Sequence, residues 1–149
     1  MNAYMNNFGA LCKVEYGNIL ATKITAGLTT LDNVDYESAT IDRAGYGSAK
    51  IMVGYSASLA CGVTAPAKIT VAMKDSTDDS TWTDYADVLA SSTLAAITST
   101  GVKEVDVDLA SYSRYIKVKY TPDLTASNTD TLITGFDVLL GGATELPAS

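Results

Sequence analysis

The clearest pattern of hydrophobic and polar positions in this chain runs from residue 102 to residue 120. It has two halves, and in each half apolar residues alternate with polar ones. The apolar positions are Val105, Val107, Leu109, Ile116, Val118 and Tyr120. A period of two with β-branched and aromatic residues predicts two strands, each with one buried and one solvent-facing side. We expect the two strands to pair antiparallel, which would set three carboxylates of the first against Lys117 and Lys119 of the second.

Other segments show the same alternation over shorter stretches. Residues 49–55 and 68–74 are expected to be central strands of one sheet, and residues 131–140 form a last, apolar strand. Residues 89–97 are rich in Leu and Ala and predict either a short helix or a packed loop. Pro122 is expected to break the ladder of the strand before it, because proline has no backbone N–H.

About eight short strands separated by turn-rich segments, without a series of long helical patterns, predict an all-β fold. We expect an antiparallel β-sandwich or jelly roll with a flexible N-terminal arm. Residues 1–33 would form this arm and an edge strand, residues 34–142 the sandwich domain, and residues 143–149 a C-terminal tail. A chain of 149 residues is long enough to bury a core of its own.

Charge and composition exclude several classes of function. The 17 acidic residues outnumber the 10 basic ones and give a net charge of −7. That is the wrong sign for gripping a phosphate backbone, so we expect no nucleic-acid partner. The sequence contains no histidine, which removes the commonest general base and the usual zinc ligands. We therefore expect no enzymatic activity, no cofactor and no metal.

The sequence also bears on location and on the cysteines. No run approaches the ~18 apolar residues of a membrane span, and the N-terminus has neither the basic region nor the long apolar region of a signal peptide. We expect a protein made in a cytoplasm, with no membrane partner. Cys12 and Cys61 have no metal-binding spacing, and the sequence leaves open whether they form a disulfide.

Residues 75–85 hold a dense group of small oxygen-bearing side chains. Such a group is typical of a tight turn in which Asp and Ser side chains cap backbone N–H groups, with Trp82 anchoring the strand that follows. A calcium loop is the alternative, because aspartates supply hard oxygen ligands, although the EF-hand spacing and turn glycine are missing. The alternating carboxylates of residues 104–108 have two interpretations as well: solvation of a strand face, or an acid cluster for catalysis.

Several motifs carry a resemblance to a known family. They are T-I-D-R-x-G-Y-x-S-A at residues 40–49, K-D-S-T-D-D-S-T-W-T at 74–83, V-D-V-D-L at 105–109, S-R-Y-I-K-V at 113–118 and L-L-G-G at 139–142. Together they resemble small virion proteins of tailed bacteriophages, most of all head decoration or capsid cement proteins. The resemblance implies a non-enzymatic protein on the outside of an assembled shell, made in the host cytoplasm. It further implies a trimer at local threefold axes that clamps neighbouring copies of the phage major capsid protein.

The N-terminal segment supplies two candidate partner-binding residues. Tyr4 and Phe8 are isolated aromatics in a polar, Asn-rich stretch. This stretch is either a disordered terminus or an arm that docks on a neighbour, and an arm that adds a strand to a capsid sheet would be one means of attachment.

A second resemblance supplies three further candidates. Residues 79–83 and 114–117 are also similar to a turn and a strand of discoidin-like, galactose-binding carbohydrate modules. Sugar sites use exposed aromatics with charged or amide side chains, and Arg43, Tyr46 and Tyr112 are the candidates for this role. In a sandwich such tyrosines also serve core or rim packing. A phage tail or neck component is a third interpretation.

Overall fold

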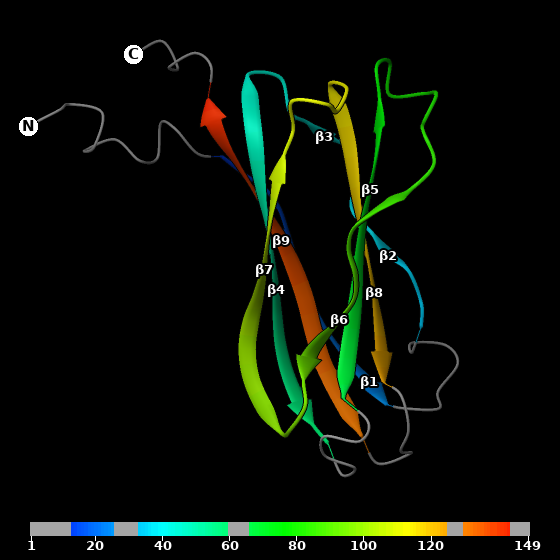
Figure 1. Cartoon of the computed structure of the whole chain (residues 1–149), viewed down its shortest axis with the longest axis vertical. Helices are drawn as coiled ribbons and strands as arrows, with labels where there is room; N and C mark the ends of the chain where they lie inside the picture. The colour runs from blue at the N-terminus through cyan, green and yellow to red at the C-terminus, as the bar shows by residue number, and fades with distance from the viewer. Residues whose placement is uncertain (1–12, 26–32, 60–65, 125–129, 144–149) are drawn as a thin grey trace, which may run out of the picture.

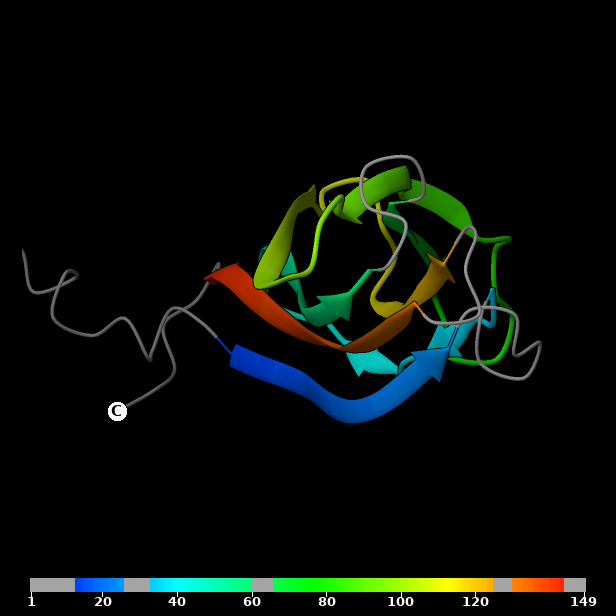
Figure 2. The same ribbon diagram turned by 90° about the horizontal axis from the view of Figure 1, so that it is seen from below.

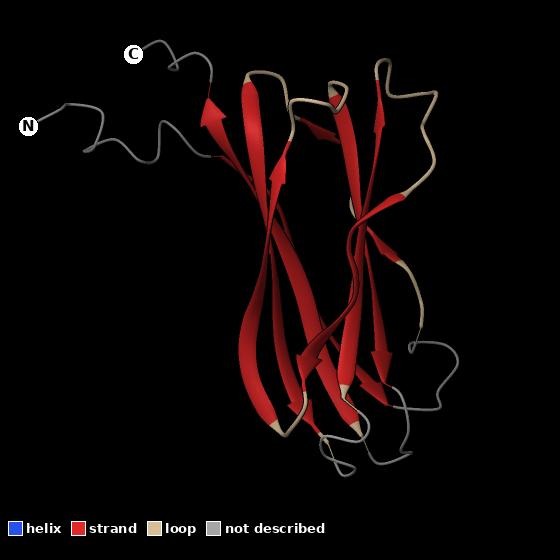
Figure 3. Cartoon of the chain, in the orientation of Figure 1, coloured by secondary structure: helices blue, strands red, loops and turns tan. Residues whose placement is uncertain are grey.

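The computed structural model describes residues 13–25, 33–59, 66–124 and 130–143, the first of these ranges for its backbone only. The described residues form nine β-strands and no helix (Figure 3). The strands are β1 (Lys13–Thr25), β2 (Tyr36–Glu37), β3 (Ile41–Asp42), β4 (Tyr46–Ser58), β5 (Ala67–Ser76), β6 (Ala86–Ala95), β7 (Ser99–Asp108), β8 (Tyr115–Leu124) and β9 (Thr131–Ala143).

These strands form two antiparallel sheets packed face to face (Figures 1 and 2). Sheet A has the order β1-β9-β4-β7. Sheet B has the order β2-β8-β5-β6, and β3 pairs with β8 beside β2. From β6 to β9 consecutive strands alternate between the sheets, as in a jelly roll. The predicted all-β antiparallel sandwich is confirmed.

The core lies between the sheets and is built from every second residue of the long strands. Buried and half-exposed residues alternate along the whole of β8. Tyr120 and Phe136 are each 1% exposed, and their rings meet edge to face with centroids 4.9 Å apart. Fully burying an apolar side chain of this size contributes about 1.5–3 kcal/mol. The predicted alternation in residues 102–120 is confirmed, since all six apolar positions are buried.

The predicted hairpin between the two halves of residues 102–120 is wrong. β7 pairs with β4 in sheet A, whereas β8 pairs with β5 and β2 in sheet B. Alternation specifies which face of a strand is buried, but it does not specify the neighbouring strand. The connection 109–114 crosses from one sheet to the other, so each charged outer face finds its partners elsewhere.

Three other expectations are corrected. The runs 49–55 and 68–74 are central strands, but they belong to opposite sheets as β4 and β5. Residues 89–97 are not a helix, because most of them lie in β6, which pairs irregularly with β5. β8 continues through Pro122, which pairs with Ile69. The Pro122 carbonyl accepts from the Asn33 N–H at 2.9 Å, so the proline nitrogen faces that edge of β8 and no bond to β5 is lost.

Candidate interaction surfaces

One end of the sandwich is tied together by Arg43. Its Nε donates to the Ser113 carbonyl at 2.9 Å and its Nη1 to the Tyr46 carbonyl at 3.2 Å. Its Nη2 donates to the carbonyl of Tyr112. A charge-assisted bond of this kind is stronger than a neutral one. Arg43 therefore fastens the connection 109–114 to the turn that precedes β4.

The structure brings together three of the five sequence-predicted contact residues. Arg43, Tyr46 and Tyr112 lie at this end, and both tyrosines are partly buried against the core. The Arg43 guanidinium uses three donor atoms on backbone carbonyls. Tyr4 and Phe8 lie outside the described residues, and so do Cys12 and Cys61.

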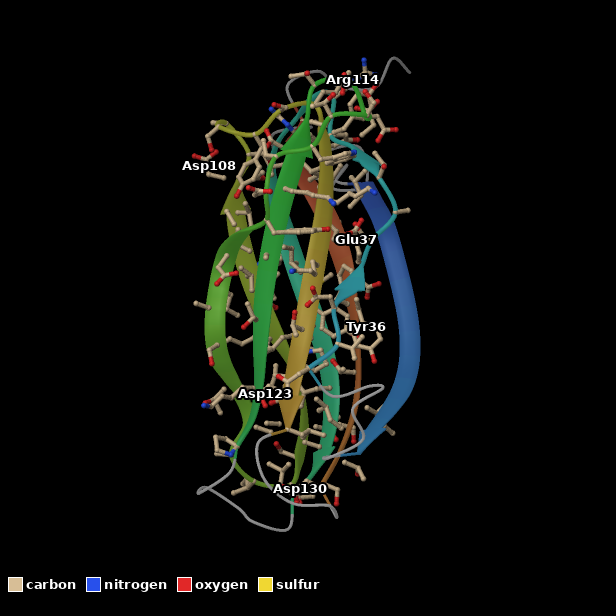
Figure 4. All side chains as sticks on the ribbon, turned by 90° about the vertical axis from the view of Figure 1, so that its right-hand side faces the viewer. Tyr36, Glu37, Asp108, Arg114, Asp123 and Asp130 are labelled. Carbon is tan, nitrogen blue, oxygen red and sulfur yellow. The ribbon has the colours of Figure 1, made fainter. Side chains whose placement is uncertain are left out.

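A salt bridge lies next to this cluster at the same end of the sandwich. Arg114 reaches Asp42 with Nη2 at 2.7 Å and Nε at 3.0 Å. Figure 4 shows Arg114 at the tip of the molecule. Because this pair is exposed and screened by water, we expect it to orient the loop more than to stabilise the fold.

The turn predicted over residues 75–85 is confirmed. Oδ1 of Asp78 accepts from the backbone N–H groups of Ser80 at 2.9 Å and Thr81 at 2.8 Å. These bonds hold the pKa of Asp78 far below its usual range. Asp75 accepts from the Ser113 N–H at 2.6 Å. The carboxylates thus serve as caps, and among the described residues no group of three or more acidic or cysteine side chains is placed to hold a metal.

The outer face of sheet B carries a layer of lysines, aromatic rings and carboxylates that cover one another. Lys74 on β5 stands directly opposite Lys117 on β8. Glu37 on β2 lies 3.5 Å from the first ammonium and 3.1 Å from the second, which offsets the repulsion between two like charges across a ladder. Figure 4, which looks onto this sheet, shows Glu37 beside β8.

Two aromatic rings complete this layer. Tyr85 has the ammonium groups of Lys74 and Lys119 each 4.5 Å from its ring centroid. Trp82 has Lys117 at 4.9 Å and Lys74 at 5.5 Å. Each such cation–π contact is worth about 0.5–2 kcal/mol, depending on how far it is removed from water. The side chain of Lys74 is only 17% exposed, so we call this layer the covered face.

The pKa values of the titratable groups on the covered face are shifted by their neighbours. Burial alone raises the pKa of Glu37, but Tyr85 and the two lysines lower it overall. A hydrogen bond from Thr121, followed by one from Lys119, lowers the pKa of Asp35. Burial raises the pKa of Tyr85, and the Glu37 carboxylate raises it further, so the phenol stays protonated.

Sequence reasoning identified Trp82 as an anchor but missed Tyr85 and Glu37. Tyr85 follows a polar turn and Glu37 lies in a two-residue strand, so neither has a run of alternating neighbours. The three lysines of β5 and β8 could have indicated these partners, because lysines in neighbouring central strands require anionic or aromatic neighbours.

The outer face of sheet A is built differently, and we call it the open face. It comprises the outward residues of three strands, namely Ser48, Lys50, Met52, Gly54, Ser56, Ser58, Thr100, Val102, Glu104, Asp106, Asp108, Thr131, Ile133, Gly135, Asp137, Leu139 and Gly141. Gly54 pairs with Gly135 on one side and with Val102 on the other. Val102 is 60% exposed and Ile133 is 42% exposed. A Cβ added to Gly54 would meet no atom within 4 Å among its described surroundings beyond its chain neighbours.

The end of the open face near Asp108 is hollowed. An open depression of about 460 Å³ is lined by Ser48, Ala49, Lys50, Asp106, Val107, Asp108, Leu139 and Gly141. The Lys50 ammonium lies 2.7 Å from Glu104 and 3.0 Å from Asp106, and these bonds raise the pKa of Lys50. Asp108 accepts from the Ala110 N–H at 2.9 Å. The Lys50 ammonium therefore lies against two carboxylates of β7, and a third carboxylate, that of Asp108, lies farther along the same strand.

No family model and no curated protein matches this chain. Several solved structures are distantly similar to it. A structure of infectious bursal disease virus, Gx strain, matches with a TM-score of 0.47 and 11% identity, over 89% of this chain and 32% of that chain. The VP2 subviral particle of infectious bursal disease virus matches with a TM-score of 0.42 and 11% identity, over 91% of this chain and 34% of that chain.

A carbohydrate-binding module is similar to a comparable degree. The CBM22-1 xylan-binding domain of Paenibacillus barcinonensis Xyn10C matches with a TM-score of 0.39 and 12% identity, over 89% of this chain and 86% of that domain. The chain spans about a third of the length of the viral chains that it matches. Likenesses this distant carry no argument about what the chain binds. The described residues include no helix long and apolar enough to cross a membrane.

Proposed function

We propose that this chain is a non-enzymatic structural protein of a phage virion, which binds the outside of an assembled capsid and stabilises contacts between capsid subunits. The observation that carries this proposal is the difference between the two outer faces. The polar groups of the covered face are used by one another, whereas the open face presents Val102 and Ile133 to solvent. A sandwich whose polar groups contact one another on one face, and whose other face exposes apolar side chains, is suited to binding a partner through the second face.

The motifs over residues 40–142 that resemble head decoration proteins support this proposal. In such a protein, function depends on several weak contacts made at once. A trimer at a local threefold axis would turn later contacts into intramolecular ones, and avidity can then exceed a single contact by roughly 10²–10⁴. The partner in this proposal is the major capsid protein.

The carbohydrate-binding alternative has less support from the geometry. Its candidate cation, Arg43, already donates to three carbonyls. Its candidate aromatics, Tyr46 and Tyr112, pack partly against the core and do not form an exposed platform. The aromatic rings of the covered face have lysine ammonium groups over them, which leaves less ring surface for stacking on a sugar.

Co-sedimentation of the purified protein with expanded phage shells that lack it tests the proposal. Saturable binding at a fixed ratio to capsid subunits, with added density on the shell exterior, is the expected result. Absence of binding to shells, together with clear binding on a glycan array, would replace the proposal with the carbohydrate-binding alternative. Light scattering on the free protein would test the expected trimer separately.

A further inference from the structure

We propose that the open face is the capsid-docking surface, and that its occupant is an extended capsid segment that is apolar over Gly54 and carries a lysine or arginine at the depression. This inference rests on the proposed function and adds to it the surface and the chemistry of the partner.

The pair of glycines at the centre of the sheet is the first part of the argument. Glycine in a strand interior has no side chain to pack and costs roughly 0.5–1 kcal/mol relative to alanine. At Gly54 the described neighbours leave open space for a Cβ, so none of them requires glycine there. The pairing of Gly54 with β7 and β9 runs without a bulge, and a glycine in such a strand often marks the close approach of a ligand or another backbone.

The side chains around the glycines indicate what approaches. Val102 lies directly beside Gly54 across the ladder, and Ile133 lies one side-chain step beyond Gly135 on β9. Single exposed apolar residues are ordinary on a protein surface. Here two of them flank the same bare backbone, which matches an apolar segment lying across β4 and β9.

The depression determines the charge of the partner. Lys50 is shared by Glu104 and Asp106, and Asp108 lies beyond them on β7. This region therefore carries an excess of negative charge. A second copy offering the same face would bring like charges together, which disfavours self-docking. Leu139 and Gly141 also line the depression, and this combination suits a lysine or arginine, whose apolar stem packs while its cationic head meets a carboxylate.

The test is a binding titration of three variants on expanded shells that lack the protein, with the thermal unfolding of each free variant measured in parallel. Gly54→Val fills the open space above Gly54 and should weaken binding about tenfold or more, with an unchanged or higher Tm. Asp106→Asn should weaken binding several-fold and reduce its dependence on salt. Asp87→Asn makes the same charge change on exposed β6 of sheet B and should bind as the wild type does.

The outcomes separate this inference from the proposed function. Wild-type binding with equally tight binding of Gly54→Val and Asp106→Asn would overturn the docking surface and leave the capsid role in place. Equal weakening by Asp106→Asn and Asp87→Asn would overturn the assignment of the depression, because it would indicate a general charge effect. Failure of the wild type to bind shells would remove the capsid role, and the docking surface with it.

Discussion

The two outer faces of the sandwich use similar residues to opposite effect. On the covered face, nearly every lysine ammonium group contacts a carboxylate or an aromatic ring, and the lysine side chains are mostly shielded from water. On the open face, Lys50 is left with an excess of carboxylates, and Gly54 leaves open space above its strand. The difference teaches that the outer side of the same alternating pattern can be either covered or exposed, depending on which side chains cross above the strands.

Removing the ring of Tyr85 from the covered face should have the largest effect on stability. We expect Tyr85→Ala to lower the free energy of unfolding by about 2–3 kcal/mol, because it removes a half-buried ring and two cation–π contacts. Tyr85→Phe keeps the ring and should cost about 1 kcal/mol or less. Urea denaturation followed by tryptophan fluorescence would measure both. Equal losses from both variants would contradict the role of the ring.

Substitutions at two glycines test whether the fold requires glycine at position 54. A Cβ on Gly101 would lie 2.7 Å from the Tyr55 hydroxyl, so Gly101→Ala should destabilise the protein by about 1–2 kcal/mol through overpacking. Gly54→Ala should leave stability unchanged or raise it by about 0.5 kcal/mol. Thermal unfolding of the two variants decides the matter, and a marked loss of stability in Gly54→Ala would show that the fold requires this glycine.

Acid should weaken the covered face, because its carboxylates stabilise it only while they are charged. The folded-state pKa values of Glu37 and Asp35 lie below their usual values of 4.5 and 3.8. Their stabilisation is therefore fully present above those usual values and is lost as the pH falls through the folded-state values. Glu37→Gln should cost about 0.5–1 kcal/mol near pH 7, since solvent screens a partly exposed group, and the cost should shrink as the pH falls below 4.5. A variant that loses the same stability at every pH would contradict this assignment.

The smallest effect belongs to the exposed charges of the open face. Asp106 is 79% exposed in its side chain, so Asp106→Asn should leave the Tm unchanged within error. Its effect should appear only in binding to shells. A clear fall in Tm would mean that the carboxylates of β7 hold the sheet together and are not available to a partner.

The sequence allowed the buried half of each strand to be predicted, because side-chain direction follows a strict period of two. Val105, Val107 and Ile116 are buried as the pattern indicated. Strand partners could not be predicted in the same way, since β7 and β8 are neighbours in sequence but lie in opposite sheets. Pairing depends on where the connections cross, and the carbonyls that Arg43 gathers there belong to residues distant in the chain.

The same limit applied to the candidate surfaces. Arg43, Tyr46 and Tyr112 were identified from residue type, and the structure gathers them at one end. The pair of glycines at the centre of the open face was not predicted, because Gly54 alone looks like any glycine in a strand. Its partner Gly135 lies 81 positions later in the sequence and directly opposite in the sheet.

Pro122 has a consequence for how copies of this protein behave when crowded together. Exposed sheet edges are templates on which other chains add strands and aggregate. At Pro122 the edge of β8 beyond β2 has no N–H to offer, and its carbonyl is already bonded to Asn33. An intruding strand would find no donor there and a carbonyl that is already engaged. This edge therefore resists the formation of mixed sheets between copies at high protein concentration.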